Sequence, residues 1–365
     1  MSEANLALHL KHCIQKVATG PEYSKDLSYN EAYQAMQHML SAEADPVQTA
    51  IYFIALRMKR ETDEENRGTL QALIDHSTIS HAAVEELVDI SDPYDGFARG
   101  IPASSFVPAV LASLGVPAVV HGLETVGPKY GATHHQVLKA AGVKVDLTPQ
   151  QATQQLEQLG WTYIDQASFA PALHALVPLR QRMVKRQVLT TVETMLGPIR
   201  ARGKTHCMGG YVHKAYPPIY ASLARQAGFA TAIFVRGVEG GVIPSLQQAG
   251  RLFAYPAQAQ ECQVDLAPQD LGILAETRAV PLPPDLVPAE DALIDSEALA
   301  TKAARLGLAA LAGERGLTYD SLVYACTICL SQLRHYPDLP TAAQAVRAVL
   351  DSGQALTVFK AAQQR

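Results

Sequence analysis

The chain has 365 residues, of which 48% are hydrophobic and 18% are charged, and its formal net charge is −5. This composition excludes an intrinsically disordered chain, and the length allows two domains with large cores. The negative charge excludes a general attraction to nucleic acid or anionic membranes. No apolar run reaches the roughly 18 residues of a membrane span, and the N-terminus lacks the order of a signal peptide, so we expect a cytoplasmic protein without a membrane partner.

The first part of the chain is predicted to be a helical domain over residues 1–85. Residues 28–31 and 62–65 have the Ser/Thr-x-x-Glu pattern of a capping box, in which side chain and backbone satisfy each other's polar groups at a helix start. Asp45 followed by Pro46 is a third helix start. Apolar residues at helical spacing follow each signal, which predicts a small bundle.

From about Val88 short apolar runs alternate with helical patterns, which predicts an α/β domain over residues 86–365. Its fold class is a mostly parallel central sheet flanked by helices. Part of 170–200 is expected to join the helical domain. The predicted strands are 117–120, 143–147, 207–212, 231–235, 252–256 and 263–266, and the predicted helices are 133–141, 149–159, 171–196 and 215–228.

Five cysteines, an odd number, argue against a disulfide framework. Cys326 and Cys329 form a C-x-x-C, but they lie in a helical pattern and no second pair completes a zinc site. We expect both to be buried structural residues. Redox or metal chemistry is the alternative.

Local charge departs from the total between residues 178 and 206. Seven basic residues stand there against one acidic residue, Glu193, a net charge of +6. Such asymmetry indicates an anionic partner, although a charge run on a helix is often only a solvated face. The basic residues are Arg180, Arg182, Lys185, Arg186, Arg200, Arg202 and Lys204.

Helical spacing predicts a basic ridge in the first part of this segment. Arg182, Lys185 and Arg186 stand at i, i+3 and i+4 and would share one face of a helix over 171–196. Met183, Val184, Val188 and Met195 would face the core. Arg180 projects toward the apolar side, so it is expected to contact a cleft ligand or form a buried ion pair.

The order of several motifs resembles the anthranilate phosphoribosyltransferase family, glycosyltransferase family 3, which includes nucleoside phosphorylases on the same architecture. The stretches that carry the resemblance are YNEAYQAMQHMLSAEADPVQTAIYFIALRMKRETDEE, VPAVVHG, HHQVLKAAGVKVDLTPQQATQQLEQLG, FVRGVEG and AVRAVLDSGQAL. They span roughly residues 25–360. The resemblance implies a helical domain against a larger α/β domain, a cleft between them, and a homodimer through the helical domain.

Two loops depart from the family's phosphate-binding patterns. The region DISDPYDGFARG (89–100) stands where the resemblance places a Gly-Thr-Gly-Gly-Asp loop, and Pro93 removes a backbone donor there. The family's Lys-His-Gly-Asn-Arg corresponds to Val120-His121-Gly122-Leu123-Glu124, so only His121 and Gly122 keep their types. Glu124 in place of arginine would repel a pyrophosphate.

The third departure concerns magnesium. The resemblance places a Leu-Asp-Glu after Gly-x-Asp-Gly, and this chain has Gly241, Val242 and Ile243 there. Magnesium needs hard oxygen ligands, which these side chains lack. We therefore expect no metal and no cofactor.

The family's Arg-x5-Arg is matched by Arg180 and Arg186, and the helix that follows is one turn longer than in the anthranilate enzymes. This length and the altered loops resemble a divergent subfamily whose members are described as homodimers that bind nucleic acid without evident sequence specificity. The resemblance makes Lys129 and His121 further candidate anion contacts. Tyr94, Phe97 and Arg99 lie in the altered phosphate loop and could stack bases, or Phe97 could simply fill the pocket.

Two function classes follow, and catalytic residues are assigned for neither. One is a protein that binds nucleic acid or another phosphate-bearing, nucleotide-like anion along 178–206. The other is an active pentosyltransferase or phosphorylase on a different substrate, with Arg180, Arg186 and His121 as anion contacts. Anthranilate transfer itself is not expected, because three loops would each need repair.

Overall fold

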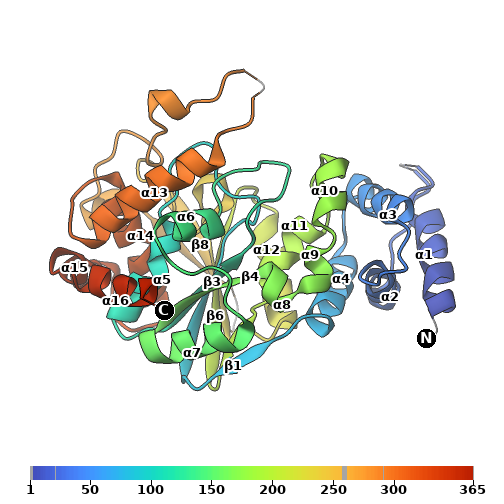
Figure 1. Ribbon diagram of the computed structural model, residues 1–365, viewed down its shortest axis with the longest axis horizontal. Helices are drawn as coiled ribbons and strands as arrows, with labels where there is room; N and C mark the ends of the chain where they lie inside the picture. Colours follow the sequence, from blue (N-terminus) through green and yellow to red (C-terminus); the bar gives the residue numbers. More distant parts are fainter. Residues whose placement is uncertain (1–2, 21, 257–260, 291, 365) are drawn as a thin grey trace.

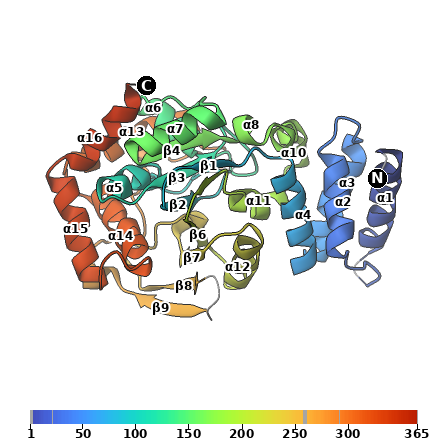
Figure 2. The same cartoon turned by 90° about the horizontal axis from the view of Figure 1, so that it is seen from below.

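A computed structural model of the chain describes residues 3–20, 22–256, 261–290 and 292–364. Among them no helix is long and apolar enough to cross a membrane. Figure 2 shows the helical bundle at one end of the molecule, the sheet in the middle and the C-terminal helices at the other end.

The helical domain forms where the capping signals predicted it. Its helices are α1 (Glu3–Val17), α2 (Tyr29–Met39), α3 (Pro46–Lys59) and α4 (Asp63–Asp75). Ser28 and Thr62 each accept a hydrogen bond from the backbone of the glutamate three residues on, and both capping boxes are complete. Asp45 accepts a bond from the backbone N–H of Gln48.

The described residues of the α/β domain contain a seven-stranded sheet in the order β4-β3-β2-β6-β7-β8-β9. The first five strands in this order are parallel, and β8 and β9 are antiparallel. A separate parallel pair joins β1 to β5. The strands are β1 (Ser80–Ala82), β2 (Glu86–Ser91), β3 (Ala118–Gly122), β4 (Trp161–Asp165), β5 (Ile199–Ala201), β6 (Lys204–Tyr211), β7 (Thr231–Arg236), β8 (Gly250–Pro256) and β9 (Cys262–Leu266).

Helices surround this sheet (Figure 1). They are α5 (Val107–Ser113), α6 (His134–Ala140), α7 (Pro149–Leu159), α8 (Gln166–Phe169), α9 (Pro171–His174), α10 (Val177–Met183), α11 (Leu189–Val192), α12 (Tyr216–Gln226), α13 (Ser296–Leu311), α14 (Leu317–Gln332), α15 (Leu339–Asp351) and α16 (Gln354–Gln363). Short 3-10 turns include η2 (Glu193–Met195) and η3 (Val238–Gly240).

Alternate residues of the strands feed two hydrophobic cores. Val88 and Ile90 of β2 join a core with α5 and α13–α16. Leu87 and the β3 residue Val119 join a second core, which continues into the helical domain through residues of α1–α4. Successive side chains of a strand point to opposite faces of the sheet. One face therefore packs on α5 and α13–α16, and the other face joins the α/β domain to the helical domain.

One strand prediction was wrong, and four strands, β1, β2, β4 and β5, were not predicted. Residues 143–147 form no strand, although Val143, Val145 and Leu147 alternate with exposed residues, because this segment packs on the cores without a strand partner. Residues 161–165 form β4, which is buried throughout and so lacks an alternating pattern.

The single helix expected over 171–196 was also wrong. The chain breaks into α9, α10, α11 and η2, and the residue that caps the end of α10, Val184, has a φ of 61°. A positive φ strains a β-branched residue. The break lets Val188 and Leu189 turn into the core beside the helical domain, where both are fully buried.

Candidate anion-binding site at the carboxyl edge of the sheet

The parallel strands β2, β3, β6 and β7 end at one edge, where the loops after each strand meet. In α/β folds ligands bind at this edge. Asp92, buried just after β2, connects the loops: its carboxylate accepts hydrogen bonds from the backbone of Val242 at 2.8 Å and from the hydroxyl of Ser104, and it lies 3.3 Å from Nε2 of His134. This network fixes the loop after β2 against the loop after β7.

Asp95 is a second buried carboxylate in the same loop, and two cations neutralise it. Arg186 lies 2.9 Å and Lys129 lies 3.2 Å from its oxygens. Gly96 follows with φ 74°, and a Cβ atom there would lie 2.5 Å from the carbonyl oxygen of Gly131. Glycine is therefore required for the loop to approach the 128–132 segment.

Glu239, in the turn after β7, supplies a third carboxylate, which faces the loop after β2. It accepts hydrogen bonds from the backbone N–H groups of Ala98 and Arg99, at 3.0 and 2.8 Å, and lies 3.9 Å from Lys129. Its φ is 55°, an uncommon conformation for a residue with a side chain. Backbone N–H groups that could hold an external anion are thus occupied by the chain's own carboxylate.

Tyr94 and His121 are buried and hydrogen-bonded to each other. His121 is fully buried, with Nε2 2.8 Å from Asp89 and Nδ1 hydrogen-bonded to the hydroxyl of Tyr94. Burial raises the pKa of Tyr94 well above its ordinary value. The ring of Tyr94 is 3% exposed and so is not open to a stacking base in this structure, and Gly122 is likewise buried at the end of β3.

Arg180 forms the buried ion pair that the sequence offered as one of two alternatives. Its two terminal nitrogens lie 2.7 and 2.6 Å from the carboxylate oxygens of Glu193, and both side chains are 1% exposed. Gln166 donates a further bond to the same carboxylate. Arg180 therefore holds α10 against η2 and is unavailable to a ligand.

The expected basic ridge is divided. Arg182 lies on α10, whereas Lys185 and Arg186 follow the helix end, so the predicted common helical face was wrong. Val184 is 67% exposed and does not face the core as predicted. Arg182 and Lys185 are nevertheless exposed and precede Arg186, which reaches Asp95.

Arg200, Arg202 and Lys204 do not continue this surface. Arg200 lies on β5, with its guanidinium 4.1 Å from the ring centroid of Phe229, and burial lowers its pKa. Lys204 is the first residue of β6, Arg202 stands two residues before it, and both are exposed. They lie at the amino edge of the sheet, because β6 runs from Lys204 toward the carboxyl edge.

Two further cations lie at the carboxyl edge and were not predicted. Arg236 is the last residue of β7, paired in register with Tyr211 of β6, and Lys214 follows the end of β6. Both are exposed. Each of them comes at the end of an apolar run that is typical of a strand, and this position was the signal in the sequence that could have identified them. We define the basic rim as Arg99, Lys129, Arg182, Lys185, Arg186, Lys214 and Arg236.

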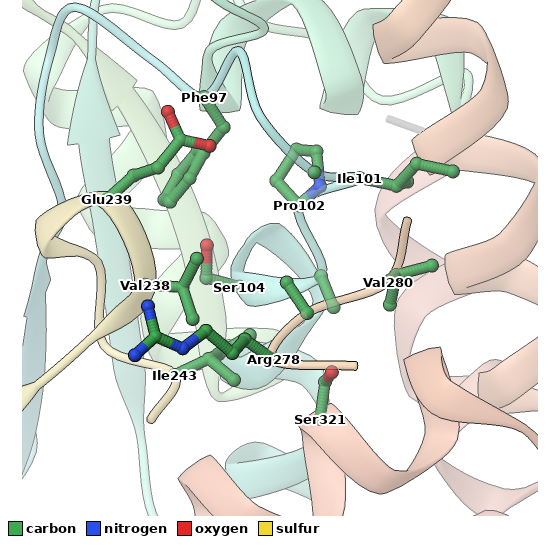
Figure 3. Close-up of a pocket in the computed structure, with 13 residues that line it drawn as sticks. Phe97, Ile101, Pro102, Ser104, Val238, Glu239, Ile243, Arg278, Val280 and Ser321 are labelled. Carbon is green, nitrogen blue, oxygen red and sulfur yellow. The ribbon is translucent and has the colours of Figure 1, made fainter. Parts of the chain in front are cut away.

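A pocket opens beside the rim, between the loop after β2 and the turn after β7 (Figure 3). Its interior volume is about 30 Å³, which is room for one or two water molecules. Its apolar walls are Phe97, Ile101, Pro102, Val238, Ile243 and Val280. Phe97, which the sequence offered as a residue that fills this pocket, forms one of its walls.

The magnesium that the resemblance implies does not fit these residues. Ile243 lines the pocket with an alkyl side chain, and Val242 is fully buried and contributes its backbone N–H to Asp92. Neither offers a side-chain oxygen, which magnesium requires. Within the described ranges, no group of three or more His, Cys, Asp or Glu residues is placed to hold a metal ion.

Two histidines at the start of α6 and the two cysteines of the C-x-x-C have structural positions. His134 and His135 begin α6, whose cap is Thr133, and they contact different carboxylates, those of Asp92 and Asp165. Cys326 and Cys329 are fully buried in α14, and burial raises the pKa of both thiols.

Comparison with known proteins agrees with this architecture. Residues 11–77 match the helical bundle domain, and residues 99–356 match the α/β domain, of a glycosyl transferase family. An anthranilate phosphoribosyltransferase of Xanthobacter autotrophicus is 26% identical over 354 residues, 94% of this chain and 93% of that protein. One from Geobacillus kaustophilus is 31% identical over 233 residues, 63% of this chain and 65% of that protein.

Solved structures share the fold over nearly the whole chain. Anthranilate phosphoribosyltransferase from Thermus thermophilus superposes with a TM-score of 0.73 at 20% identity, covering 98% of each chain. The enzyme from Saccharomyces cerevisiae in complex with PRPP and Mg gives a TM-score of 0.76 at 14% identity, covering 100% of this chain and 99% of that one. The chain thus belongs to the glycosyl transferase family that joins a helical bundle to an α/β domain, and it is an anthranilate phosphoribosyltransferase-like member of it.

Proposed function

We propose that this protein binds nucleic acid through the basic rim and does not transfer a phosphoribosyl group to anthranilate. The observation that carries the proposal is the division of charge at the carboxyl edge. The inner anion positions are taken by Asp95 and Glu239, whereas Arg182 and Lys185 remain exposed. A polyanion that lies across the outside can use these cations without entering the inner site.

A relative's ligand gives the chemical class. The yeast structure holds PRPP and Mg, so phosphate is bound on this fold. In this chain a compact pyrophosphate would meet the carboxylate of Glu239 at the N–H groups of Ala98 and Arg99, and like charges repel. A nucleic acid presents its phosphates one at a time along a backbone, which suits a row of separate cations better.

The test is fluorescence anisotropy of labelled single- and double-stranded DNA with the wild-type protein at two salt concentrations. We expect binding at low salt that weakens steeply as salt rises, because cations on a chain of net charge −5 act only locally. Absence of binding to either DNA at low salt would contradict the proposal.

Glu239 gives a second test. Removing its carboxylate in Glu239→Ala frees two backbone donors and Lys129, so inorganic pyrophosphate should bind the variant and raise its melting temperature, while the wild type shows no shift. Glu239→Gly is the matched variant, since it also relieves the positive φ. Equal pyrophosphate stabilisation of wild type and variants would show that Glu239 does not block the site.

Pentosyl transfer to another acceptor is the alternative, favoured by the family relationship. Of its three proposed anion contacts, Arg180 and His121 are committed to buried partners, and Arg186 alone reaches the edge. Turnover of phosphoribosyl pyrophosphate, or phosphate-dependent release of a base from a nucleoside, would establish it.

We further propose a homodimer through the helical domain. Val47, Ile51 and Met58 form an exposed apolar stripe on α3, and Leu8 is exposed on the neighbouring α1. Apolar side chains grouped in this way favour burial against another surface. A second copy presents the same stripe, which suits a symmetric contact.

Replacing Ile51 and Met58 by glutamate should convert a dimer to a monomer in sedimentation equilibrium, because charges would be buried at the interface. Leu293→Glu, at an exposed position in the α/β domain, is the control and should leave the mass unchanged. A wild-type chain that sediments as a monomer would refute this arrangement.

A further inference from the structure

Aromatic rings form a row along the loop after β6 and the start of α12. The ring centroid of His213 lies 6.2 Å from that of Tyr216, and the Tyr216 centroid lies 5.3 Å from that of Tyr220. Tyr220 in turn lies 5.5 Å from the ring centroid of Phe234, which is fully buried in β7. The row therefore begins inside the protein and ends at His213, which is exposed.

Cations lie at both ends of this row. Lys214 of the basic rim directly follows His213 in the chain. At the inner end, burial raises the pKa of Tyr220, and the charges of Arg186 and Asp95 shift that pKa in opposite directions. The ion pair that these two residues form therefore lies near Tyr220. Phosphates held by Lys214 and Arg186 would lie along the row of rings.

The fold fixes the row at the carboxyl edge of the sheet. The helix α12 lies between the sheet and the helical domain (Figure 2). A hydrogen bond to Tyr216 raises the pKa of Arg57 on α3, so this ring is tied to the helical domain. A Cβ atom at Gly240 would lie 3.5 Å from side-chain atoms of Val212 and Pro93, so the loop after β6 adjoins the turn after β7 and the loop after β2.

The ring of His213 is available for a further ring. Among the described residues its side chain has no hydrogen bond or ion pair, and its one ring contact is with Tyr216. Exposed aromatic rings set among cations are the arrangement on which single-stranded nucleic acids stack their bases. A base on the outer face of His213 would extend the row by one ring.

We infer that His213 and Tyr216 form a stacking platform for an unpaired base of a single strand whose phosphates lie on the basic rim. The inference rests on the proposed function and adds to it a preference for single-stranded over double-stranded nucleic acid. Bases inside a duplex are stacked on each other and paired, so their faces are not available to the platform. Because every base has a flat aromatic face, we expect little dependence on sequence.

The experiment compares two labelled oligonucleotides of equal length and charge, one with bases throughout and one with an abasic stretch at its centre. The wild-type protein should bind the complete strand about tenfold more tightly than the abasic strand, the size expected for stacking of one base. In His213→Ala this affinity ratio should fall to about twofold, because only the half-buried ring of Tyr216 remains. His81→Ala, at an exposed position on β1 outside the rim, is the matched control and should leave the ratio unchanged.

The outcomes separate the inference from the proposed function. If neither oligonucleotide binds the wild type at low salt, the proposed function fails. If both bind with equal affinity, the rim binds nucleic acid and the stacking platform is refuted. A preference for the complete strand that persists unchanged in His213→Ala also refutes the platform.

A larger ring and a direct readout give independent tests. His213→Trp places an indole at the same exposed position and should raise the affinity ratio above that of the wild type, because a larger aromatic face stacks more strongly. A ratio no higher than that of the wild type would contradict the platform. Photocrosslinking of an iodouracil-containing strand to the wild type should label the peptide that contains His213 and Tyr216, and crosslinks confined to other peptides would overturn the inference.

Discussion

Alanine at both Arg182 and Lys185 should weaken binding to a labelled single-stranded oligonucleotide about tenfold at low salt. Both side chains are exposed, and neither has an ion pair among the described residues, so the double variant removes cations without leaving a buried carboxylate unpaired. Arg186 is left unchanged, because it neutralises Asp95. The affinity is measured by fluorescence anisotropy.

The salt dependence gives the sharper readout. Each phosphate contact on a single strand contributes about 0.7 to the slope of log K against log salt, so losing two contacts should reduce the slope by about 1.4. Arg202→Ala with Lys204→Ala is the matched control: it removes the same charge at the amino edge of the sheet and should leave the slope unchanged. An equal loss in both double variants would indicate that net charge, and not the rim, governs binding.

Arg180→Met should lower the free energy of unfolding by about 3–5 kcal/mol, because it leaves the carboxylate of Glu193 buried without its partner. Urea unfolding can be followed through Trp161, the only tryptophan of the chain, which is fully buried in β4. The double variant Arg180→Met with Glu193→Leu should recover most of the loss, since no isolated charge remains.

This second prediction also distinguishes Arg180 from its neighbours on the rim. If Arg180 contacted a ligand, Arg180→Met would reduce DNA affinity while leaving the urea midpoint near that of the wild type. We expect the reverse, a lower midpoint with an unchanged salt slope in protein that remains folded. The sequence left two roles open for Arg180, a contact to a ligand in the cleft and a buried ion pair. The measurement tests whether the ion pair, with its distance of 2.6 Å, is the role of this residue.

Local signals in the sequence predicted local structure well. The capping boxes at Ser28 and Thr62 and the Asp45-Pro46 start were confirmed, because each depends on residues within one helical turn. Most strands of the sheet were found from their apolar runs. Residues 143–147 and β4 were misassigned, because an alternating segment need not have a strand partner and a buried strand need not alternate.

The site depended on contacts that no local pattern contains. The helix break at Val184 results from burial of Val188 and Leu189 in the core, and it displaced Lys185 and Arg186 from the expected helical face. Glu239 bonds to a backbone amide 140 residues away in the chain, and nothing near either residue indicates the pairing. The sequence predicted an altered phosphate loop, but only the fold brings a carboxylate to it.

Strand direction explains why the basic segment was divided. Arg202 and Lys204 are close to Arg186 in the sequence. However, β6 begins at Lys204, at the amino edge of the sheet, and runs from there to the carboxyl edge, where Arg186 lies. Cations before and after a parallel strand lie at opposite edges of the sheet. A count of charges along the chain therefore overestimates the charge available to one ligand.

The most direct test of the central claim is hydrogen–deuterium exchange of the wild-type protein with and without a saturating single-stranded oligonucleotide at low salt. We expect slower exchange in peptides that cover the loop at Phe97–Arg99 and the segment at Arg182–Arg186, with no change at Arg202–Lys204. Protection at the amino edge, or no protection at the carboxyl edge despite binding, would contradict it.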